Sequence, residues 1–312
     1  MTVTIFNRPD VQEFLNELSG LNNKDGDPRM KQIVHRLMSE LFKAIDDLDI
    51  TPDEYWQGVA WLNDLGAAGQ VGLVSPGLGI DHFMDERLDA IDAAMGIENP
   101  TPRTIEGPLY VAGAPESVGF ARLDDGNDTN GQTLIMQGKV HGADGQPLPG
   151  AKVEVWHCDT RGFYSHFDPT GQQAPFNMRR TIVTDAQGRY KFQSILPSGY
   201  GVPPGSPTEA LLTALGRHGQ RPAHIHFFVS GEGHRKLTTQ INIEGDPLID
   251  DDFAYATRDG LVPHVIERTD ADSIAANNLT GPFAEIAFDI HLTALVDGVD
   301  NQLNEQRRRA AA

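Results

Sequence analysis

The spacing of apolar residues changes near residue 106, and this change limits the folds that the chain can adopt. Before it, apolar side chains recur every three to four residues, as in helices that bury one face. After it, short segments rich in β-branched and aromatic residues are separated by turns that contain glycine, proline or aspartate. We therefore expect a mainly β protein, with α-helices over residues 1–105 and an antiparallel β-sandwich over residues 106–312.

Four helices are expected in the first part. A wide apolar stripe over residues 30–48 predicts the longest, and a shorter one covers residues 10–18. Thr51 and Glu54 have the spacing of a capping box, with Pro52 at the first helical position, so a third helix should begin there. The fourth should cover about residues 81–95. We interpret the glycine- and proline-rich stretch 69–79 as a loop, either a plain linker or the rim of a pocket.

Repeated short strands with turns between them favour a sandwich over a parallel sheet with crossing helices. The expected strands are 133–140, 151–157, 180–184, 189–195, 224–229, 237–243 and 284–295. One short helix, around residues 208–215, should interrupt them. The last residues, 306–312, should be frayed.

The charge balance and the single cysteine limit the partners and the compartment. Lysine and arginine number 25 against 44 aspartates and glutamates, a net charge of −19, which repels nucleic acid. Cys158 has no partner for an internal disulfide, as expected in a reducing compartment. No basic leader with an apolar run opens the chain, and no stretch approaches the roughly 20 apolar residues of a membrane span. We expect a cytoplasmic protein.

His224 and His226 stand two residues apart in a segment expected to be a strand. Side chains along a strand alternate between its faces, so both imidazoles should project from the same face. Two neutral imidazoles that converge from a rigid element make half of a metal site. The pattern alone leaves open the simpler interpretation that both are packing residues.

Tyrosine is scarce, with six in 312 residues, and two of the six lie in glycine-containing loops after expected strands. Tyr164 follows Gly162, and Tyr200 lies between Gly199 and Gly201. Glycine lets the backbone approach a site closely at such positions. Composition alone, however, favours half-exposed rings.

Several separated motifs resemble those of the intradiol ring-cleavage dioxygenases, most closely the branch that acts on catechol. These motifs are Gly138, Val140, Gly145, Leu148, Val153-Glu154-Val155, Gly162-Phe163-Tyr164, Ser198-Gly199-Tyr200-Gly201, Pro222-Ala223-His224-Ile225-His226 and, from the helical part, Ile105-Glu106-Gly107-Pro108-Leu109-Tyr110. They follow the order found in that family and span nearly the whole chain.

The resemblance implies a non-haem iron enzyme that cleaves catechol with O2 to cis,cis-muconate, in aromatic compound degradation through the β-ketoadipate pathway. One Fe(III) per subunit would be held by Tyr164, Tyr200, His224 and His226. Phenolate oxygens stabilise the hard ferric ion, and imidazole suits iron generally. Coordination would deprotonate the tyrosines, whose ordinary pKa is about 10.

The resemblance also implies roles for residues around the iron. Tyr200 would leave the metal and take a proton from catechol, and the Arg221 guanidinium would stabilise the negative charge that develops on the ring. Gln240 would orient ligands through hydrogen bonds. The substrate would contact Leu73, Pro76, Ile105, Gly107, Pro108, Arg221, Phe253 and Ala254. A wall of this kind favours catechol, then methylcatechols, over bulkier rings.

The same resemblance implies a homodimer formed through the helical part, with a hydrophobic tunnel between subunits that can hold a phospholipid. The broad apolar stripes over residues 30–65 agree with a dimer, although packing within one chain would draw the same stripes.

Three alternatives follow from the same residues. The nearest is a sister enzyme that cleaves chlorocatechol or hydroxyquinol with the same chemistry. The second is a non-catalytic β-sandwich module with a structural metal, although structural zinc prefers cysteine and histidine to tyrosine. The third is an extradiol enzyme, in which iron(II) is held by two histidines and a carboxylate. Glu232 is the nearest acidic residue after the histidine pair, and this arrangement leaves both tyrosines without a role.

Overall fold

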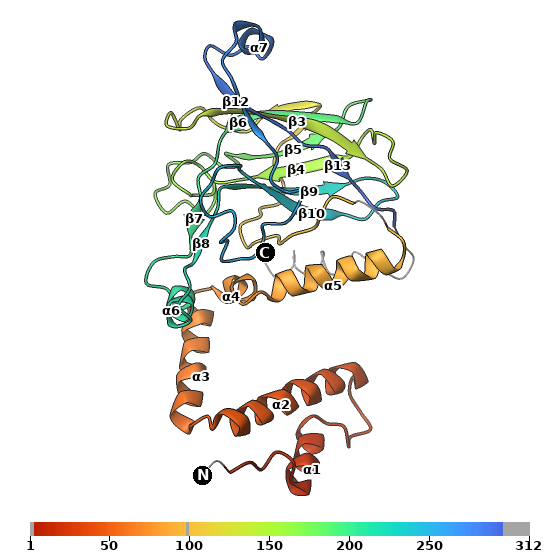
Figure 1. Cartoon of the computed structure of the whole chain (residues 1–312), viewed down its shortest axis with the longest axis vertical. Coiled ribbons are helices and arrows are strands. Elements are labelled where there is room, and N and C mark those ends of the chain that lie inside the picture. The colour runs from red at the N-terminus through yellow and green to blue at the C-terminus, as the bar shows by residue number, and fades with distance from the viewer. Residues whose placement is uncertain (1–2, 98–99, 296–312) are drawn as a thin grey trace. The chain divides into compact units, whose positions relative to one another are not determined.

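The computed structural model describes residues 3–97 and 100–295, and the chain forms two compact units. The first ends at Ala68 and the second begins at Gly69. The helices of the first unit are α1 (Pro9–Leu18), α2 (Pro28–Leu48) and α3 (Pro52–Ala67) (Figure 1). The domain boundary expected near residue 105 remains a prediction, and the expected frayed tail, 306–312, lies outside the described residues.

Local sequence determines where the helices of the first unit begin. Each starts with a proline, whose missing N–H has no partner to lose at that position. Before α3, the Thr51 hydroxyl accepts a hydrogen bond from the Glu54 N–H, and the Glu54 carboxylate accepts one from the Thr51 N–H. The predicted capping box is therefore confirmed. The Asp27 carboxylate caps α2 by accepting bonds from the N–H groups of Arg29 and Met30.

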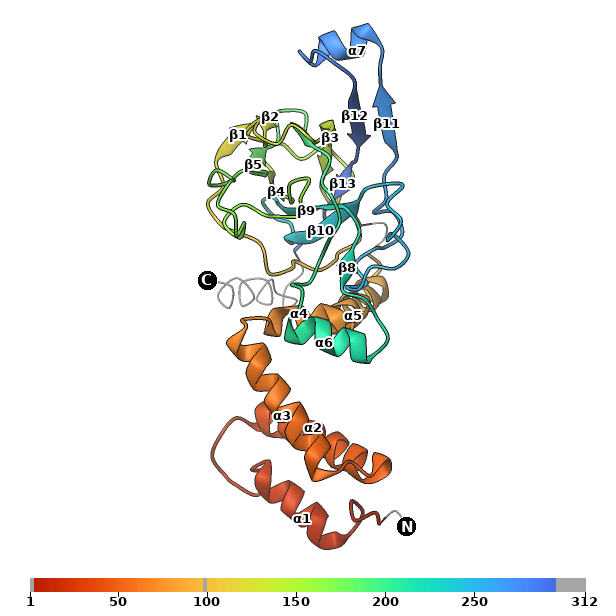
Figure 2. The same cartoon turned by 90° about the vertical axis from the view of Figure 1, so that its left-hand side faces the viewer.

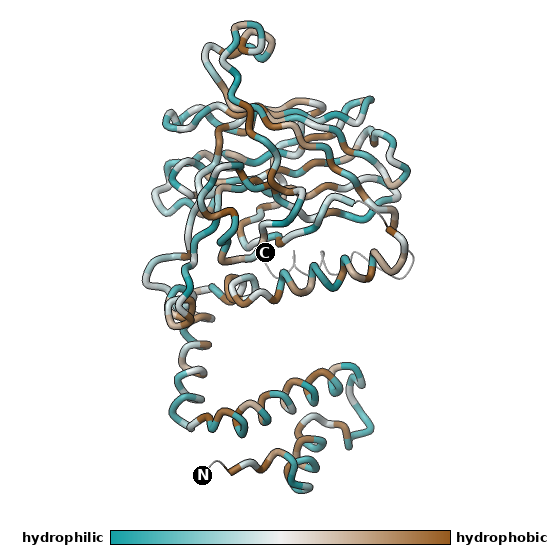
Figure 3. Tube along the Cα trace, viewed as in Figure 1, coloured by the Kyte–Doolittle hydropathy of each residue, from teal (hydrophilic) through white to brown (hydrophobic). Residues whose placement is uncertain are grey.

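The apolar stripe of α2 is largely open to solvent. Met30 is 56% exposed and Leu37 60%, and no residue of α2 is buried. Figure 3 shows hydrophobic positions recurring along this helix. Since contiguous apolar faces usually mark an interaction site, α2 presents a surface suited to a partner.

The second unit begins with two further helices, α4 (Val71–Gly77) and α5 (Ile80–Ala94). The helix expected over 81–95 is confirmed, but the interpretation of 69–79 as a loop is wrong. Pro76 lies in the last turn of α4, where the break that proline causes coincides with the end of the helix. Among the described residues, no helix is both long enough and apolar enough to cross a membrane.

Two sheets form the body of the second unit (Figure 1, Figure 2). In the first, the strand order is β1 (Glu116–Val118), β5 (Arg179–Val183), β4 (Lys152–Trp156), β9 (His224–Ser230) and β10 (Leu237–Asn242). In the second, it is β11 (Val265–Arg268), β12 (Phe283–Ala287), β3 (Thr133–His141), β6 (Arg189–Ile195) and β2 (Phe120–Arg122), and β13 (Ile290–His291) also pairs with β3. The expected sandwich with a helical N-terminal part is confirmed.

Shorter elements connect these strands. Strand β7 (Tyr200–Gly201) pairs with β8 (Gln220–Arg221), and α6 (Pro207–Ala214) lies between them in sequence. Helix α7 (Ala271–Ala276) connects β11 to β12 (Figure 2). The expected strands and the expected short helix agree with the observed ones to within a residue, except that 284–295 divides into β12 and β13.

The sheets are mixed, which corrects the expectation of a strictly antiparallel sandwich. The central pairs β3–β6, β4–β5, β4–β9 and β9–β10 are antiparallel, whereas β1–β5, β2–β6, β12–β3 and β13–β3 are parallel. Between β1 and β2 stands Gly119, whose N–H bonds to the Val183 carbonyl on β5 and whose carbonyl accepts from Lys191 on β6. The chain thus crosses between the sheets over one residue. Strands of three residues show no alternation, so sequence could not reveal this pairing.

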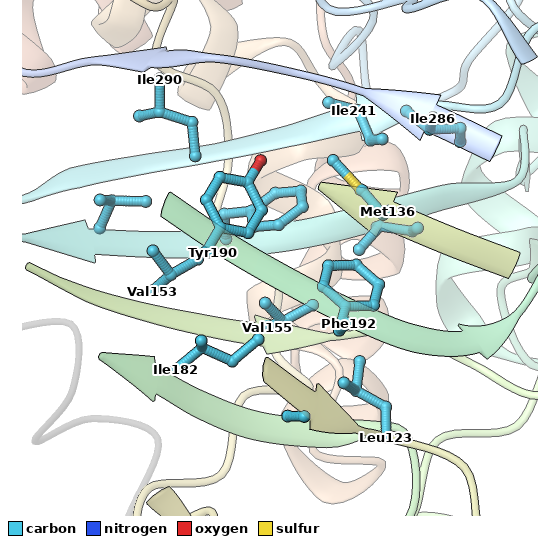
Figure 4. Packing of buried hydrophobic residues seen from close by; sticks show 14 of the residues in the cluster. Leu123, Met136, Val153, Val155, Ile182, Tyr190, Phe192, Ile241, Ile286 and Ile290 are labelled. Atoms are coloured by element: carbon cyan, nitrogen blue, oxygen red, sulfur yellow. The ribbon is translucent and has the colours of Figure 1, made fainter. Parts of the chain in front are cut away.

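Strand β9 is covered on both of its faces. Ile225, Phe227 and Val229 project into the core between the sheets, which also contains Val153, Val155, Phe192, Ile241 and Ile286 (Figure 4). His224 and His226 project from the other face, where their neighbour Phe228 packs against Trp156. Since the core residues are fully buried, they fix the place of the histidines on the opposite face.

Candidate active site

Four polar side chains converge on the face of β9 that points away from the core. The Nε2 atoms of His224 and His226 lie 3.1 Å apart. The Oη atoms of Tyr164 and Tyr200 lie 3.3 Å and 3.4 Å from His224 Nε2. The structure therefore brings together all four residues that the resemblance implies as iron ligands.

Neighbouring strands hold the histidines in place. His226 lies opposite Trp156 of β4 on one side and Gln240 of β10 on the other. The Trp156 and His226 rings stack at 4.9 Å between centroids, with 5° between their planes. The His224 Nδ1 atom lies 2.7 Å from the Pro222 carbonyl oxygen, so this nitrogen carries the proton and leaves the Nε2 lone pair facing the cluster.

Glycines allow the surrounding loops to come this close. A Cβ atom on Gly162 would lie 2.8 Å from the Tyr200 Cβ, and one on Gly199 would lie 2.6 Å from the Arg221 carbonyl oxygen. Gly107 has a φ of +70° and passes close to His226, since a Cβ there would lie 3.7 Å from its ring. A side chain at 162 would push its loop away from Tyr200, and one at 199 would push its loop away from Arg221, whereas at 107 it is the positive φ that favours glycine.

Burial keeps both imidazoles neutral. It lowers the pKa of His224 to about 3, and the nearby Arg221 guanidinium adds to the shift. Burial, followed by the neighbouring His224, lowers the pKa of His226 well below its ordinary value. Neutral imidazole is the form that binds metals, so both side chains are in the ligand state.

Burial also raises the pKa of both tyrosines. For Tyr164 the proximity of Tyr200 adds to the rise, whereas for Tyr200 the Arg221 guanidinium opposes it. The protein alone therefore keeps both as phenols, and a strongly charged cation is needed to release their protons.

Arg221, on β8, contacts three groups of the site. Its Nη1 lies 3.1 Å from His224 Nε2, and its Nη2 donates to Gln240 Oε1 at 2.9 Å. The Nε and Nη2 atoms also donate to the two carboxylate oxygens of Asp252, at 3.2 Å and 3.1 Å. Burial alone would lower the pKa of Arg221, but the Asp252 carboxylate holds it above its ordinary value. The guanidinium is thus a fixed positive charge at the site.

Sequence reasoning missed Asp252. It is fully paired with Arg221, and burial, which would raise its pKa, is outweighed by the guanidinium, which keeps that pKa below its ordinary value. Asp252 ends a run of three aspartates, Asp250 to Asp252, which looks like a solvated turn. The one sequence signal for a role of Asp252 in the site was its position next to Phe253 and Ala254, which the resemblance implies contact substrate.

The residues expected to contact substrate are close to one another. Ile105, Phe253 and Ala254 belong to one buried apolar cluster, and Leu73 packs against it. Pro76 is buried on α4, and the adjacent Gly77 lies against the Phe253 ring. Pro108 lies near Gly72, since a Cβ added there would be 3.9 Å from the Pro108 Cβ.

The third alternative, an extradiol site, does not match this geometry. Glu232 is exposed and follows the far end of β9. Within 3–97 and 100–295, no group of three or more histidine, cysteine, aspartate and glutamate side chains is placed to hold a metal ion. A metal at the histidine pair would therefore have the two tyrosines as its other protein ligands.

Comparison with known proteins agrees with this site. Residues 27–96 match the family described as catechol dioxygenase N terminus, and residues 105–294 match the family described as dioxygenase. A catechol 1,2-dioxygenase of Acinetobacter baylyi is 65% identical over 310 residues, which are 99% of this chain and 100% of the relative. Catechol 1,2-dioxygenase 1 of Acinetobacter lwoffii is 52% identical over 312 residues, the full length of both chains.

A solved structure leads to the same conclusion. The mercury-inhibited catechol 1,2-dioxygenase from Acinetobacter sp. ADP1 superposes with a TM-score of 0.92 and 66% identity, covering 96% of this chain and 97% of that one. With the paired family matches and the site geometry, this likeness identifies the chain as a member of the intradiol dioxygenase family. Enzymes of this family depend on iron.

The close contact at Gly162 gives a test of this packing. Gly162→Ala should lower the free energy of unfolding more than Gly150→Ala, by about 1–3 kcal/mol, which is typical of overpacking. Both glycines have positive φ, +82° and +75°, but a Cβ at Gly150 meets nothing within 4 Å. Urea titrations of both variants measure the difference. Equal losses would mean that backbone conformation alone requires glycine at 162.

Proposed function

We propose that this chain is a catechol 1,2-dioxygenase that uses O2 to open the ring between its two hydroxyl-bearing carbons, giving cis,cis-muconate in aromatic compound degradation. This proposal rests on the convergence of two phenol oxygens and two neutral imidazole nitrogens: both phenol oxygens and the His226 Nε2 atom lie 3.1–3.4 Å from His224 Nε2. The relatives at 65% and 52% identity are both named for this activity. Sister enzymes for chlorocatechol or hydroxyquinol would share the same donor atoms, so substrate tests distinguish them.

The donor set suits one Fe(III) per chain, held by Tyr164, Tyr200, His224 and His226. Two lone-pair nitrogens that face each other at 3.1 Å repel unless a cation or a shared proton lies between them. Phenolate oxygens favour the ferric over the ferrous ion. When bound, the iron would supply a Lewis acid that binds catechol and activates its ring toward O2.

The surroundings of the two tyrosines support different roles for them. Tyr164 is 2% exposed and packed among Trp156, Cys158 and Phe228. Tyr200 is partly exposed and begins a strand of only two residues. Tyr200 is therefore freer to move away from His224, and, as the phenolate that a bound cation would create, its Oη would accept one catechol proton, while Tyr164 stays in place.

Arg221 and Gln240 act on charge and orientation. Arg221 places a positive charge beside His224, where it stabilises the negative charge that builds up on the substrate ring. Gln240 accepts from Arg221 and donates to Asn242 Oδ1 at 2.8 Å, so its side chain has a fixed orientation. A fixed amide of this kind can orient groups next to the iron.

Substrate choice depends on the apolar wall. Leu73 and Ile105 narrow the space near the ring substituents, and Phe253 and Ala254 complete the wall. One methylene in such a wall changes selectivity by about 1–3 kcal/mol. We therefore expect kcat/KM to fall from catechol to methylcatechols and further to chlorocatechol and hydroxyquinol.

The visible spectrum of the iron-loaded protein tests the ligand set. A tyrosinate-to-iron(III) charge-transfer band should appear, and it should shift when catechol is added without oxygen. Tyr164→Phe and Tyr200→Phe should each weaken or move the band, because each removes one phenolate. Tyr190→Phe is the matched control, since the Tyr190 hydroxyl donates to the Phe288 carbonyl in the sandwich core.

A colourless protein that holds zinc, and that consumes no O2 with catechol after iron loading, would contradict the proposed function. That result would favour the non-catalytic module with a structural metal.

Leu73→Ala should relax substrate choice. Removing its methyl groups widens the wall, so the ratio of kcat/KM for 4-methylcatechol to that for catechol should rise, by about tenfold for one lost methylene-sized contact. Leu78→Ala serves as the control, because Leu78 follows the same helix but is half exposed. An unchanged ratio in Leu73→Ala would remove Leu73 from the substrate wall.

We also propose that the chain forms a homodimer through its helical part, with a phospholipid in an apolar tunnel at the interface, and that it is cytoplasmic. The exposed stripe of α2 supports the dimer and the lipid, and the single buried cysteine, which has no disulfide partner, supports the compartment. Lipid extraction from the purified protein tests for the phospholipid.

Sedimentation of two variants tests the dimer. Leu37→Glu places a charge on the exposed apolar stripe and should shift the chain toward monomer. Gln32→Glu adds the same side chain off the stripe and should leave the dimer intact. A wild-type chain that sediments as a monomer at all concentrations would contradict this assignment.

A further inference from the structure

Asp252 contacts the site arginine through both carboxylate oxygens. The Nε and Nη2 atoms of Arg221 donate to Oδ1 and Oδ2 at 3.2 Å and 3.1 Å, and the two side chains are only 4% and 1% exposed. A two-point contact fixes both the position and the plane of a guanidinium. In a buried pair, loss of one partner leaves the other charge uncompensated.

The same carboxylate also shapes the next turn of the chain. Its Oδ1 accepts the N–H of Ala254 at 3.0 Å, and its Oδ2 accepts the N–H of Ala256 at 3.3 Å. Within this turn Tyr255 has a φ of +52°, a conformation that needs such support. Phe253 and Ala254, two residues of the proposed substrate wall, therefore depend on Asp252 for their position.

A third contact connects these two parts. The Phe253 N–H donates to the carbonyl of Gln220, the residue before Arg221, at 3.1 Å. The turn that carries the wall and the strand that carries the arginine are thus joined at the backbone and at the Asp252 carboxylate. A shift in one changes the other.

We propose that Asp252 is a positioning residue that holds the Arg221 guanidinium and the Phe253–Ala254 wall in one fixed relation, so that turnover rate and substrate selectivity depend on the same carboxylate. This inference rests on the proposed function. Asp252 does not touch the tyrosine and histidine cluster directly in any of these contacts. Its effect should therefore appear in kinetics while iron binding is retained.

Asp252→Asn is the first test, with Asp250→Asn as the matched control. Asparagine keeps the shape but turns an amide or an uncharged oxygen toward the guanidinium. In the iron-loaded enzyme, kcat with catechol should fall about 10- to 100-fold, the usual range for a supporting residue. The 4-methylcatechol to catechol ratio of kcat/KM should also change. Asp250 is exposed on the same turn, and its variant should match the wild type in both measurements.

Iron content and the visible band separate positioning from general damage. Both should be unchanged in Asp252→Asn, because the four proposed ligands are intact. Asp252→Glu retains the carboxylate and should keep more activity than Asp252→Asn. Lost iron in both variants, or equal activity of both, would overturn the proposal in favour of a purely structural role.

A surface cavity next to Asp252 permits a rescue experiment. It has a volume of about 470 Å³, and Asp250, Asp252, Tyr255 and Thr257 are among its lining residues. In Asp252→Ala, added formate can enter from this side and pair with Arg221. Formate should restore kcat in a concentration-dependent way, but it should not restore selectivity, since it cannot also hold the backbone turn. Arg221→Met lacks the guanidinium with which formate would pair, so added formate should not raise its kcat.

The results distinguish this inference from the proposed function. Wild-type protein that does not cleave catechol would contradict the function itself. Active wild-type protein with unchanged kcat and selectivity in Asp252→Asn would overturn only the role of Asp252.

Discussion

Strand β9 is packed on both faces, and the side chains on its two faces belong to different environments. One face supplies Ile225, Phe227 and Val229 to the apolar core, and the other supplies His224 and His226 to the site. The free energy that orders the histidines therefore comes from burial of their neighbours in the sequence. This arrangement lets the protein hold electron-rich groups at short distances that they would not adopt on a mobile loop.

Electrostatics in the site follow from this burial. Neutral imidazoles and protonated phenols are what a water-poor interior favours, and the pKa shifts of all four side chains have burial as their largest cause. The exception is the charged pair of Arg221 and Asp252, which is tolerated because each group compensates the other. The interior is thus poised to accept a cation among neutral donors, with one fixed positive charge beside them.

Sequence predicted the parts of the structure that depend on local patterns. Alternation along residues 224–229 placed both histidines on one face, the capping box at Thr51 located α3, and turn residues located the main strands. The likeness to a known family, more than any pattern, joined Tyr164 and Tyr200 to the histidines. The features that the sequence did not reveal depend on distant contacts. They are helix α4, which forms although it contains Pro76, the parallel edge strands, and the burial of Asp252 by an arginine 31 residues away in sequence.

The crossing at Gly119 has a consequence for the order of folding. Its N–H requires β5 and its carbonyl requires β6, so it can bond fully only when both partners are already in place. Those partners are consecutive strands of different sheets, joined by the tight turn 185–188, so they lie close in sequence and should come together early. The parallel pairing of β1 with β5 and of β2 with β6 closes much longer loops than this turn does, so both pairings should form late. Gly119, whose backbone joins the two sheets, should then be among the last residues to form its hydrogen bonds.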